Sequence, residues 1–120
     1  MHELTIARDI YKTVCEVADN GNFGRVRAIH LEIGVLAAVN AECLRFTFEL
    51  IVEGTRLNGA ELITSEVPLK LKCGDCGCTG ISRSLNYTCP GCGSRYFEII
   101  DGKHIYIKSV EVDNNGDNNA

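Results

Sequence analysis

The hydrophobic positions near the start of the chain recur with the period of an α-helix. Apolar residues three and four positions apart form one face of a helix. This pattern predicts a helix over residues 3–19 that ends at Asn20-Gly21-Asn22, where the glycine would supply a left-handed exit. The apolar face would consist of Leu4, Ala7, Tyr11, Val14 and Ala18, widened by Ile6, Ile10 and Val17.

The next segment alternates between apolar and polar residues, which is the period of a β-strand. A half-buried strand is predicted over residues 26–35, with the pattern interrupted at Gly34. Asn40 is a typical N-cap, so a second helix is predicted from there to Gly54. The inward positions would be Ile29, Leu31, Ile33 and Val35 in the strand, opposite Ala28, His30 and Glu32, and Leu44, Phe48 and Ile51 in the helix.

The second half of the chain is predicted to contain further strands. Residues 61–72 form one or two strands interrupted at Pro68. Residues 96–100 lead to a turn at Asp101-Gly102, and residues 104–113 form a last strand with a bulge near Ser109. Residues 114–120 are polar and are expected to form a disordered tail.

Two Cys-x-x-Cys pairs lie between these strands, Cys73 with Cys76 and Cys89 with Cys92. Four thiolates at this spacing can surround one tetrahedral zinc ion, and a glycine after each pair allows a tight turn around the sulfurs. A closed site with four sulfurs leaves no position for a reactive water, so we expect a structural metal. Iron in a rubredoxin-like setting is the alternative, although the intervening chain is short and mostly polar.

The predicted fold class is therefore α+β, a small mixed sheet with two helices and an inserted zinc-ribbon-like lobe. The α/β body would comprise residues 1–70 and 98–113, and the zinc-binding lobe residues 71–97. Because the lobe is inserted before the last strand, two connections would tether it to the body.

The first three residues, Met1-His2-Glu3, can build a different metal site. The Met1 amine, the His2 amide nitrogen and the His2 imidazole form fused chelate rings, and the Glu3 amide can complete a planar set of four nitrogens. Such a set suits Ni(II) or Cu(II) rather than zinc. Any chain with a second-position histidine shows this pattern, but here the predicted helix begins immediately and would hold the terminus in place.

Composition and charge exclude several classes of function. A chain of 120 residues, 45% hydrophobic and 23% charged, has room for one modest core and a small metal-stabilised appendage. We find no membrane-length apolar run and no signal peptide, and seven cysteines fit metal ligation in a reducing compartment, so a cytoplasmic protein is expected. The net charge of −4 argues against nucleic-acid binding.

Taken together, these segments resemble the HypA/HybF nickel metallochaperone family over residues 1–113. The residues that carry the resemblance are Met1-His2-Glu3, Glu32-Ile33-Gly34, the helix segment Leu44-Arg45-Phe46-Thr47-Phe48-Glu49 with Gly54-Thr55, the two cysteine pairs, and Ile107-Lys108-Ser109-Val110-Glu111-Val112. The resemblance implies a carrier, not an enzyme, that binds Ni(II) through His2 and its neighbouring backbone. It would deliver the metal, with a HypB-type GTPase, to a NiFe hydrogenase large-subunit precursor; some members also serve urease.

Two residues depart from the family pattern. Cys78 adds a thiol after the first pair and could exchange with Cys76 as a zinc ligand or simply face solvent. His104, at the turn before the last strand, could add a nickel ligand if that turn approaches the amino terminus, although a solvated histidine is the simpler interpretation.

Two other classes of protein compete with the nickel carrier. One is a zinc-ribbon module that contacts protein or nucleic acid, with Met1-His2 incidental. The other is an enzyme, either a thiol redox protein that uses one cysteine pair or a metal hydrolase; no Ser/His/Asp set, phosphate loop or pair of catalytic carboxylates supports it.

Overall fold

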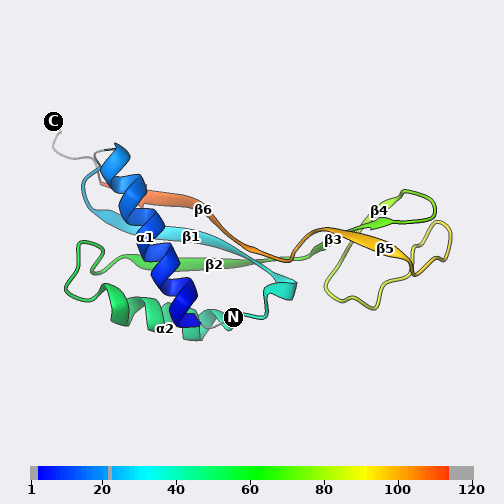
Figure 1. Ribbon diagram of the computed structural model, residues 1–120, viewed down its shortest axis with the longest axis horizontal. Coiled ribbons are helices and arrows are strands. Elements are labelled where there is room, and N and C mark those ends of the chain that lie inside the picture. The colour runs from blue at the N-terminus through cyan, green and yellow to red at the C-terminus, as the bar shows by residue number, and fades with distance from the viewer. Residues whose placement is uncertain (1–2, 22, 114–120) are drawn as a thin grey trace. The chain divides into compact units, whose positions relative to one another are not determined.

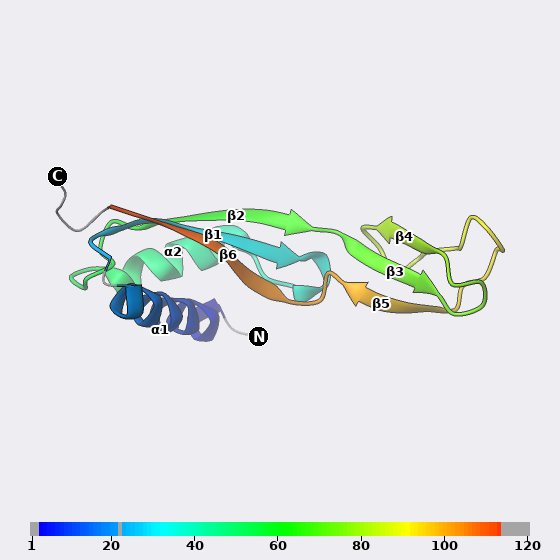
Figure 2. The same ribbon diagram turned by 90° about the horizontal axis from the view of Figure 1, so that it is seen from above.

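The computed structural model describes residues 3–21 and 23–113 (Figures 1 and 2). Its elements in chain order are α1 (Glu3–Gly21), β1 (Val26–Gly34), a short 3-10 helix (Val35–Ala37), α2 (Ala41–Val52), β2 (Glu61–Val67), β3 (Leu69–Cys73), β4 (Thr79–Ser82), β5 (Phe97–Asp101) and β6 (Ile105–Val112). The predicted α+β class is confirmed. No helix in this part of the chain is both long enough and apolar enough to cross a membrane.

The strands form two three-stranded sheets, in the orders β2-β1-β6 and β4-β3-β5. In the first sheet β1 and β2 run in the same direction, joined by α2 (Figure 2). Backbone hydrogen bonds at both ends of β1 place β6 antiparallel to it, Asp113 N–H to Arg25 O at 2.8 Å and Gly34 N–H to His104 O at 2.9 Å. The sheet is therefore mixed. In the second sheet β3 is antiparallel to both neighbours.

The chain divides into two compact units. The first contains the chain up to Leu31, Val39–Ser65 and the chain from Ile107 onward, and the second contains Glu32–Ala38 and Glu66–Tyr106. The domain boundaries that we expected from the sequence, 1–70 with 98–113 and 71–97, stay a prediction. The expected tail, residues 114–120, lies outside the described residues.

In the first unit α1 packs against α2, and both helices cover the same face of the sheet (Figures 1 and 2). The predicted helix is confirmed, but its buried face is centred differently, because Leu4 and Val17 are more than two-fifths exposed. The buried residues of α1 are Ile6, Ala7, Ile10, Val14 and Ala18. This stripe fixes the rotation of α1 about its axis.

The left-handed conformation predicted for Gly21 is wrong. It is the last residue of α1 and is not among the glycines with positive φ, so it does not supply a left-handed exit. A Cβ at this position would instead collide with the ring of Phe23. The Phe23 ring folds back over the helix end, so a larger residue here would require that side chain to shift.

The second helix follows its prediction closely. The Asn40 side chain accepts a hydrogen bond from the Cys43 N–H at 3.0 Å, which satisfies one free donor of the first turn. Its buried residues include Leu44 and Phe48, with Val52 more deeply buried than the predicted Ile51. Gly54, with φ of 75°, follows the helix end as expected.

Most of the predicted alternation of apolar and polar residues along the strands is confirmed. Pro68 separates β2 from β3, and Asp101-Gly102 forms the expected turn, with φ of 103° at Gly102. The outward position predicted for Ala28 is wrong, because this residue is buried, with 5% exposure. In β6 the consecutive residues Lys108 and Ser109 are both exposed, so the alternation shifts where we predicted a bulge; the bulge itself stays a prediction.

The second unit has its own small core. Leu69 and Leu71 of β3 are fully buried, and Leu71 lies opposite Gly80 of β4 and Ile99 of β5. The Tyr87 ring meets Phe97 edge to face at 5.9 Å and occupies the space that a side chain at residue 80 would need. This layer of apolar side chains delivers Cys73, the last residue of β3, to the metal centre.

Candidate metal centre

The sulfurs of Cys73, Cys76, Cys89 and Cys92 come together within 4.8 Å of one another. The Cys73 and Cys92 sulfurs are 3.5 Å apart, and those of Cys76 and Cys89 are 3.6 Å apart. A zinc ion with bonds of about 2.3 Å to four tetrahedral sulfurs spaces those sulfurs about 3.8 Å apart. The four thiols therefore fit one zinc ion, as the spacing in the sequence predicted.

Two turns of the same construction hold the sulfurs. The Gly77 N–H donates to Cys73 O at 3.1 Å and the Gly93 N–H to Cys89 O at 2.8 Å, with φ of 79° and 77° at the two glycines. Such positive φ values favour glycine. The first cysteine of each pair is buried and the second is exposed, so each turn presents one sulfur from inside and one from the surface.

A second hydrogen bond closes each turn. The Cys73 N–H donates to Cys78 O and the Cys89 N–H to Ser94 O, both at 2.8 Å. Cys78 and Ser94 therefore occupy equivalent positions, and each carbonyl accepts a hydrogen bond from the first cysteine of its pair. Ser94 was not among the residues expected from the sequence, although it follows Cys89 at the same spacing as Cys78 follows Cys73, which could have identified it.

The electrostatics of the cluster favour a cation. Backbone N–H groups of Cys76 and Asp75 directed at the Cys73 sulfur lower the pKa of Cys73 to about 6. The Ser94 N–H lowers the pKa of Cys92, but the sulfur of Cys73, burial, and the sulfurs of Cys76 and Cys89 outweigh it and raise that pKa to about 12. The Cys73 thiol thus loses its proton easily, whereas the Cys92 thiol keeps its proton. A bound divalent cation removes this conflict by stabilising all four thiolates.

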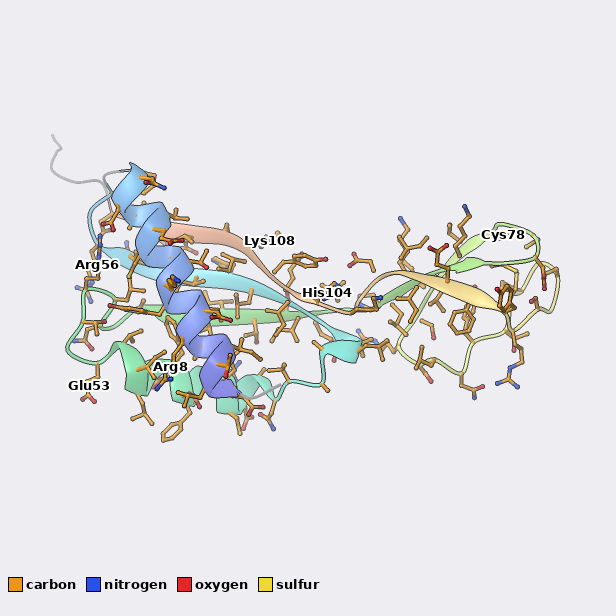
Figure 3. The ribbon with its side chains drawn as sticks, in the orientation of Figure 1. Arg8, Glu53, Arg56, Cys78, His104 and Lys108 are labelled. Carbon is orange, nitrogen blue, oxygen red and sulfur yellow. The ribbon has the colours of Figure 1, made fainter. Side chains whose placement is uncertain are left out.

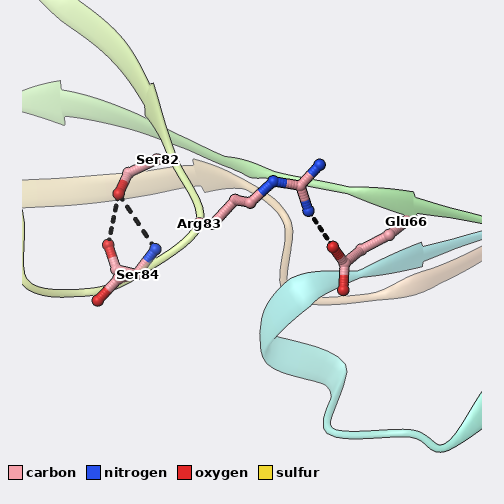
Figure 4. Close-up of polar contacts among 4 residues, drawn as sticks. All are labelled: Glu66, Ser82, Arg83 and Ser84. Atoms are coloured by element: carbon pink, nitrogen blue, oxygen red, sulfur yellow. Dashed lines mark hydrogen bonds and ion pairs between the residues drawn. The ribbon is translucent and has the colours of Figure 1, made fainter.

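The chain between the cysteine pairs is fixed by local polar contacts (Figure 4). The Ser84 N–H donates to the Ser82 hydroxyl at 3.1 Å, and that hydroxyl donates to Ser84 O at 2.8 Å. Arg83 forms an ion pair with Glu66, and Arg95 donates to the Asn86 side chain at 2.8 Å. The two arginines are therefore engaged by groups other than the sulfurs.

Cys78 does not belong to the set of four sulfurs. It is exposed, and its sulfur lies near Gly91, where a Cβ would be 3.7 Å from both the Cys78 and the Cys89 sulfurs (Figure 3). Among the described residues, the four-cysteine group is the one set of at least three potential metal ligands. Exchange of Cys78 with Cys76 stays a prediction.

The residues expected to bind nickel are only partly described. Met1 and His2 lie outside the described residues, and Glu3 is the first residue of α1. His104 is exposed in the bend before β6, with its ring edge-to-face against Tyr106 at 6.3 Å (Figure 3). The assignment of nickel to Met1, His2 and Glu3, with or without His104, stays a prediction.

Known proteins similar to this chain point to one family. A family model described as "Hydrogenase/urease nickel incorporation, metallochaperone, hypA" matches residues 1–112. The hydrogenase maturation factor HypA of Chloroflexus aurantiacus is 38% identical over 113 residues, which are 93% of this chain and 99% of that protein. The factor of the same name from Azotobacter vinelandii is 39% identical, covering 94% and 100%.

The fold is shared with a solved structure as well. The solution structure of the Ni metallochaperone HypA from Helicobacter pylori matches with a TM-score of 0.71 at 23% identity, over 93% of this chain and 97% of that one.

Proposed function

This chain belongs to the HypA family of hydrogenase/urease nickel-incorporation metallochaperones, and from that premise we propose that its Ni(II) site is the terminal Met1-His2-Glu3. The family binds nickel as cargo and zinc as a structural ion, and the four cysteines fit the zinc. A closed sphere of four sulfurs has no open position for a transferable metal. The nickel therefore needs a second donor set elsewhere in the chain.

The position of Glu3 supports the proposal. The first N–H groups of a helix have no partner within the helix, so the Glu3 amide is not committed to the hydrogen bonds of α1. Its carboxylate also complements the positive end of the helix dipole. Burial of Ile6, Ala7 and Ile10 holds the first turns in place, so the third residue of the chelate is attached to a fixed helix.

Release can follow from the chemistry of nitrogen ligands. Protonation of the imidazole or of the amine breaks the chelate, so nickel affinity should fall as the pH drops through the range of histidine. A partner contact that draws Met1 away from His2 would have the same effect. We infer delivery, in the cytoplasm and with a HypB-type GTPase, to a NiFe hydrogenase precursor or to urease. The chain would act as a carrier rather than as a catalyst.

The test is a titration of Ni(II) into zinc-loaded protein with its native, untagged amino terminus. Calorimetry and the visible absorption of planar nickel should show one equivalent bound, and His2→Ala should abolish it. His30→Ala is the matched control, since His30 pairs with Glu111 at 2.5 Å on the sheet and should leave binding intact. His104→Ala distinguishes a site of the terminus alone from one with an added imidazole.

Glu3→Gln separates the two roles of Glu3. This substitution keeps the amide and removes only the charge, so nickel binding should weaken without being lost. Equal nickel binding by the unsubstituted protein and His2→Ala would contradict the terminal site.

A further inference from the structure

A groove beside α2 is lined by apolar side chains that face solvent. It has a volume of about 460 Å³ and lies between α2 and the segment that leads from Asn58 to Glu61. Phe46 and Leu50, four residues apart on α2, form one wall and are 64% and 57% exposed. Both residues belong to the first unit, whose core is already filled by the opposite face of the same helix. Phe46 and Leu50 are therefore an exposed apolar pair outside the core of the first unit.

Carboxylates surround this apolar wall. Glu49, Glu53 and Glu61 line the same groove, and Figure 3 shows Glu53 directed away from the ribbon at the end of α2. No cation within the described residues forms an ion pair with these three groups; Arg56 pairs with Asp19, and Arg25 lies against Gly59 without pairing. These three carboxylates thus form no ion pair within the described residues, although the Arg25 guanidinium lies beside Gly59 and Arg45 stands one turn before Glu49 on α2.

The placement of two of these charges is unfavourable to the helix. Glu49 and Glu53 are one turn apart near the carboxyl end of α2, and the last turn contains no basic residue. Like charges at this spacing repel, and negative charge at a helix C-terminus opposes the dipole. Glu49 and Glu53 lower the stability of α2 at these positions, which suggests that they have a role in recognition. A positively charged partner would remove both penalties.

We propose that this groove binds a basic amphipathic helix of a partner protein. Apolar side chains of that helix would cover Phe46 and Leu50, and flanking lysines or arginines would pair with Glu49, Glu53 and Glu61. A helix presents apolar residues at the same four-residue spacing as the wall, so the two ridges can interdigitate. The groove would be a partner surface of a nickel carrier, but binding there needs no nickel and is independent of the terminal site.

The probe is a designed, fluorescently labelled peptide of about 18 residues, long enough for measurable helicity. It carries leucines at four- and three-residue spacing flanked by lysines, and its binding to zinc-loaded protein is followed by fluorescence anisotropy. Phe46→Ser should weaken binding by about tenfold or more, since an aromatic ring loses its burial. Ile81→Ser, at a position that is 70% exposed in the second unit, is the matched control and should change nothing.

A second pair of variants isolates the charge. Glu49→Lys with Glu53→Lys should weaken binding strongly, and added salt should reduce the difference from the unsubstituted protein. Asp9→Lys with Glu16→Lys makes the same change of net charge on exposed residues of α1 and should have a much smaller effect. Equal losses in the two double variants would overturn the proposal, because the attraction would then be unspecific.

Other occupants give distinct results. A peptide with central prolines that binds equally well would show that the occupant is not helical, and a peptide with glutamates in place of lysines that binds equally well would exclude the charge match. Concentration-dependent dimerisation abolished by Phe46→Ser would assign the groove to a second copy of the chain. Each outcome refutes the proposal. Nickel stoichiometry should be unchanged in all groove variants. A loss of peptide binding at the groove can therefore be distinguished from a loss of nickel binding at the terminal site.

Discussion

Gly34 provides a sharp test of how the second unit is assembled. It ends β1, its N–H donates to His104 O at 2.9 Å, and the Leu36 N–H donates to Gly102 O at 3.0 Å. A Cβ at residue 34 would overlap the carbonyl of Gly102 and lie 2.9 Å from His104 O. These are backbone atoms, which cannot rotate away as a side chain could. Gly34→Ala must therefore push the two segments apart.

The expected loss of stability combines two effects. Separation of the segments breaks or lengthens the two hydrogen bonds, each worth about 1 kcal/mol net, and overpacking adds about 1 kcal/mol more. The backbone of Gly34 has φ of −64°, which alanine adopts freely, so conformational strain adds nothing. Gly34→Ala should therefore lower the free energy of unfolding by about 3 kcal/mol.

Urea titration of the zinc-loaded protein measures this loss, followed by far-UV circular dichroism for the whole chain and by tyrosine fluorescence for the second unit, which contains Tyr87, Tyr96 and Tyr106. Gly54→Ala is the control, because its Cβ would meet nothing within 4 Å and only φ of 75° opposes it. It should cost about 1 kcal/mol. If Gly34→Ala does not give a measurable transition, accelerated zinc release to a chelator replaces it. A Gly34→Ala variant no less stable than Gly54→Ala would refute the close backbone approach.

Three further predictions concern the zinc centre. Cys76→Ser should weaken zinc binding by about a hundredfold, because it removes one of four ligands and thus about a quarter of the binding free energy. Cys78→Ser should leave zinc affinity unchanged. Equal losses in a competition titration would make Cys78 a ligand. Zinc affinity should also fall as the pH drops, because each bound thiolate competes with protons. The pKa of Cys73 is lowered to about 6, so in the metal-free protein its thiolate contributes stability above the ordinary thiol pKa, and this contribution is lost as the pH falls through 6. A chromophoric chelator that takes up zinc equally at neutral and mildly acidic pH would contradict this expectation.

The features predicted correctly from the sequence are those that local chemistry determines. Asn40 caps α2 because its side chain reaches an N–H three residues ahead, and the glycines after each cysteine pair adopt the positive φ that the turns require. Pro68 separates two strands because it cannot donate to a sheet. In each case the cause lies within a few residues of the effect.

The features missed depend on contacts between distant segments. β4 was not predicted because Thr79–Ser82 has too few residues for a pattern, and its pairing with β3 determines its conformation. Gly21 was assigned a left-handed conformation by its position after a helix, but the fold-back of Phe23 determines its role. Ala28 alternates onto the outer side, yet it is only 5% exposed in the folded chain. The groove beside α2 escaped notice because it requires the segment from Asn58 to Glu61 as its second wall.

The proposed nickel donors and the four cysteines differ in geometry and in ligand type, so the two metals would bind at separate sites. Four thiolates in a tetrahedral arrangement match zinc, which has no geometric preference from its d electrons, and the positions of the sulfurs are fixed by the backbone turns around Gly77 and Gly93. The proposed terminal set is planar and made of nitrogens, which suits Ni(II) and Cu(II) but not zinc. Geometry and ligand type then separate zinc from nickel, whereas copper, which such a planar site binds more tightly than nickel, must be excluded by metal availability and by the partner.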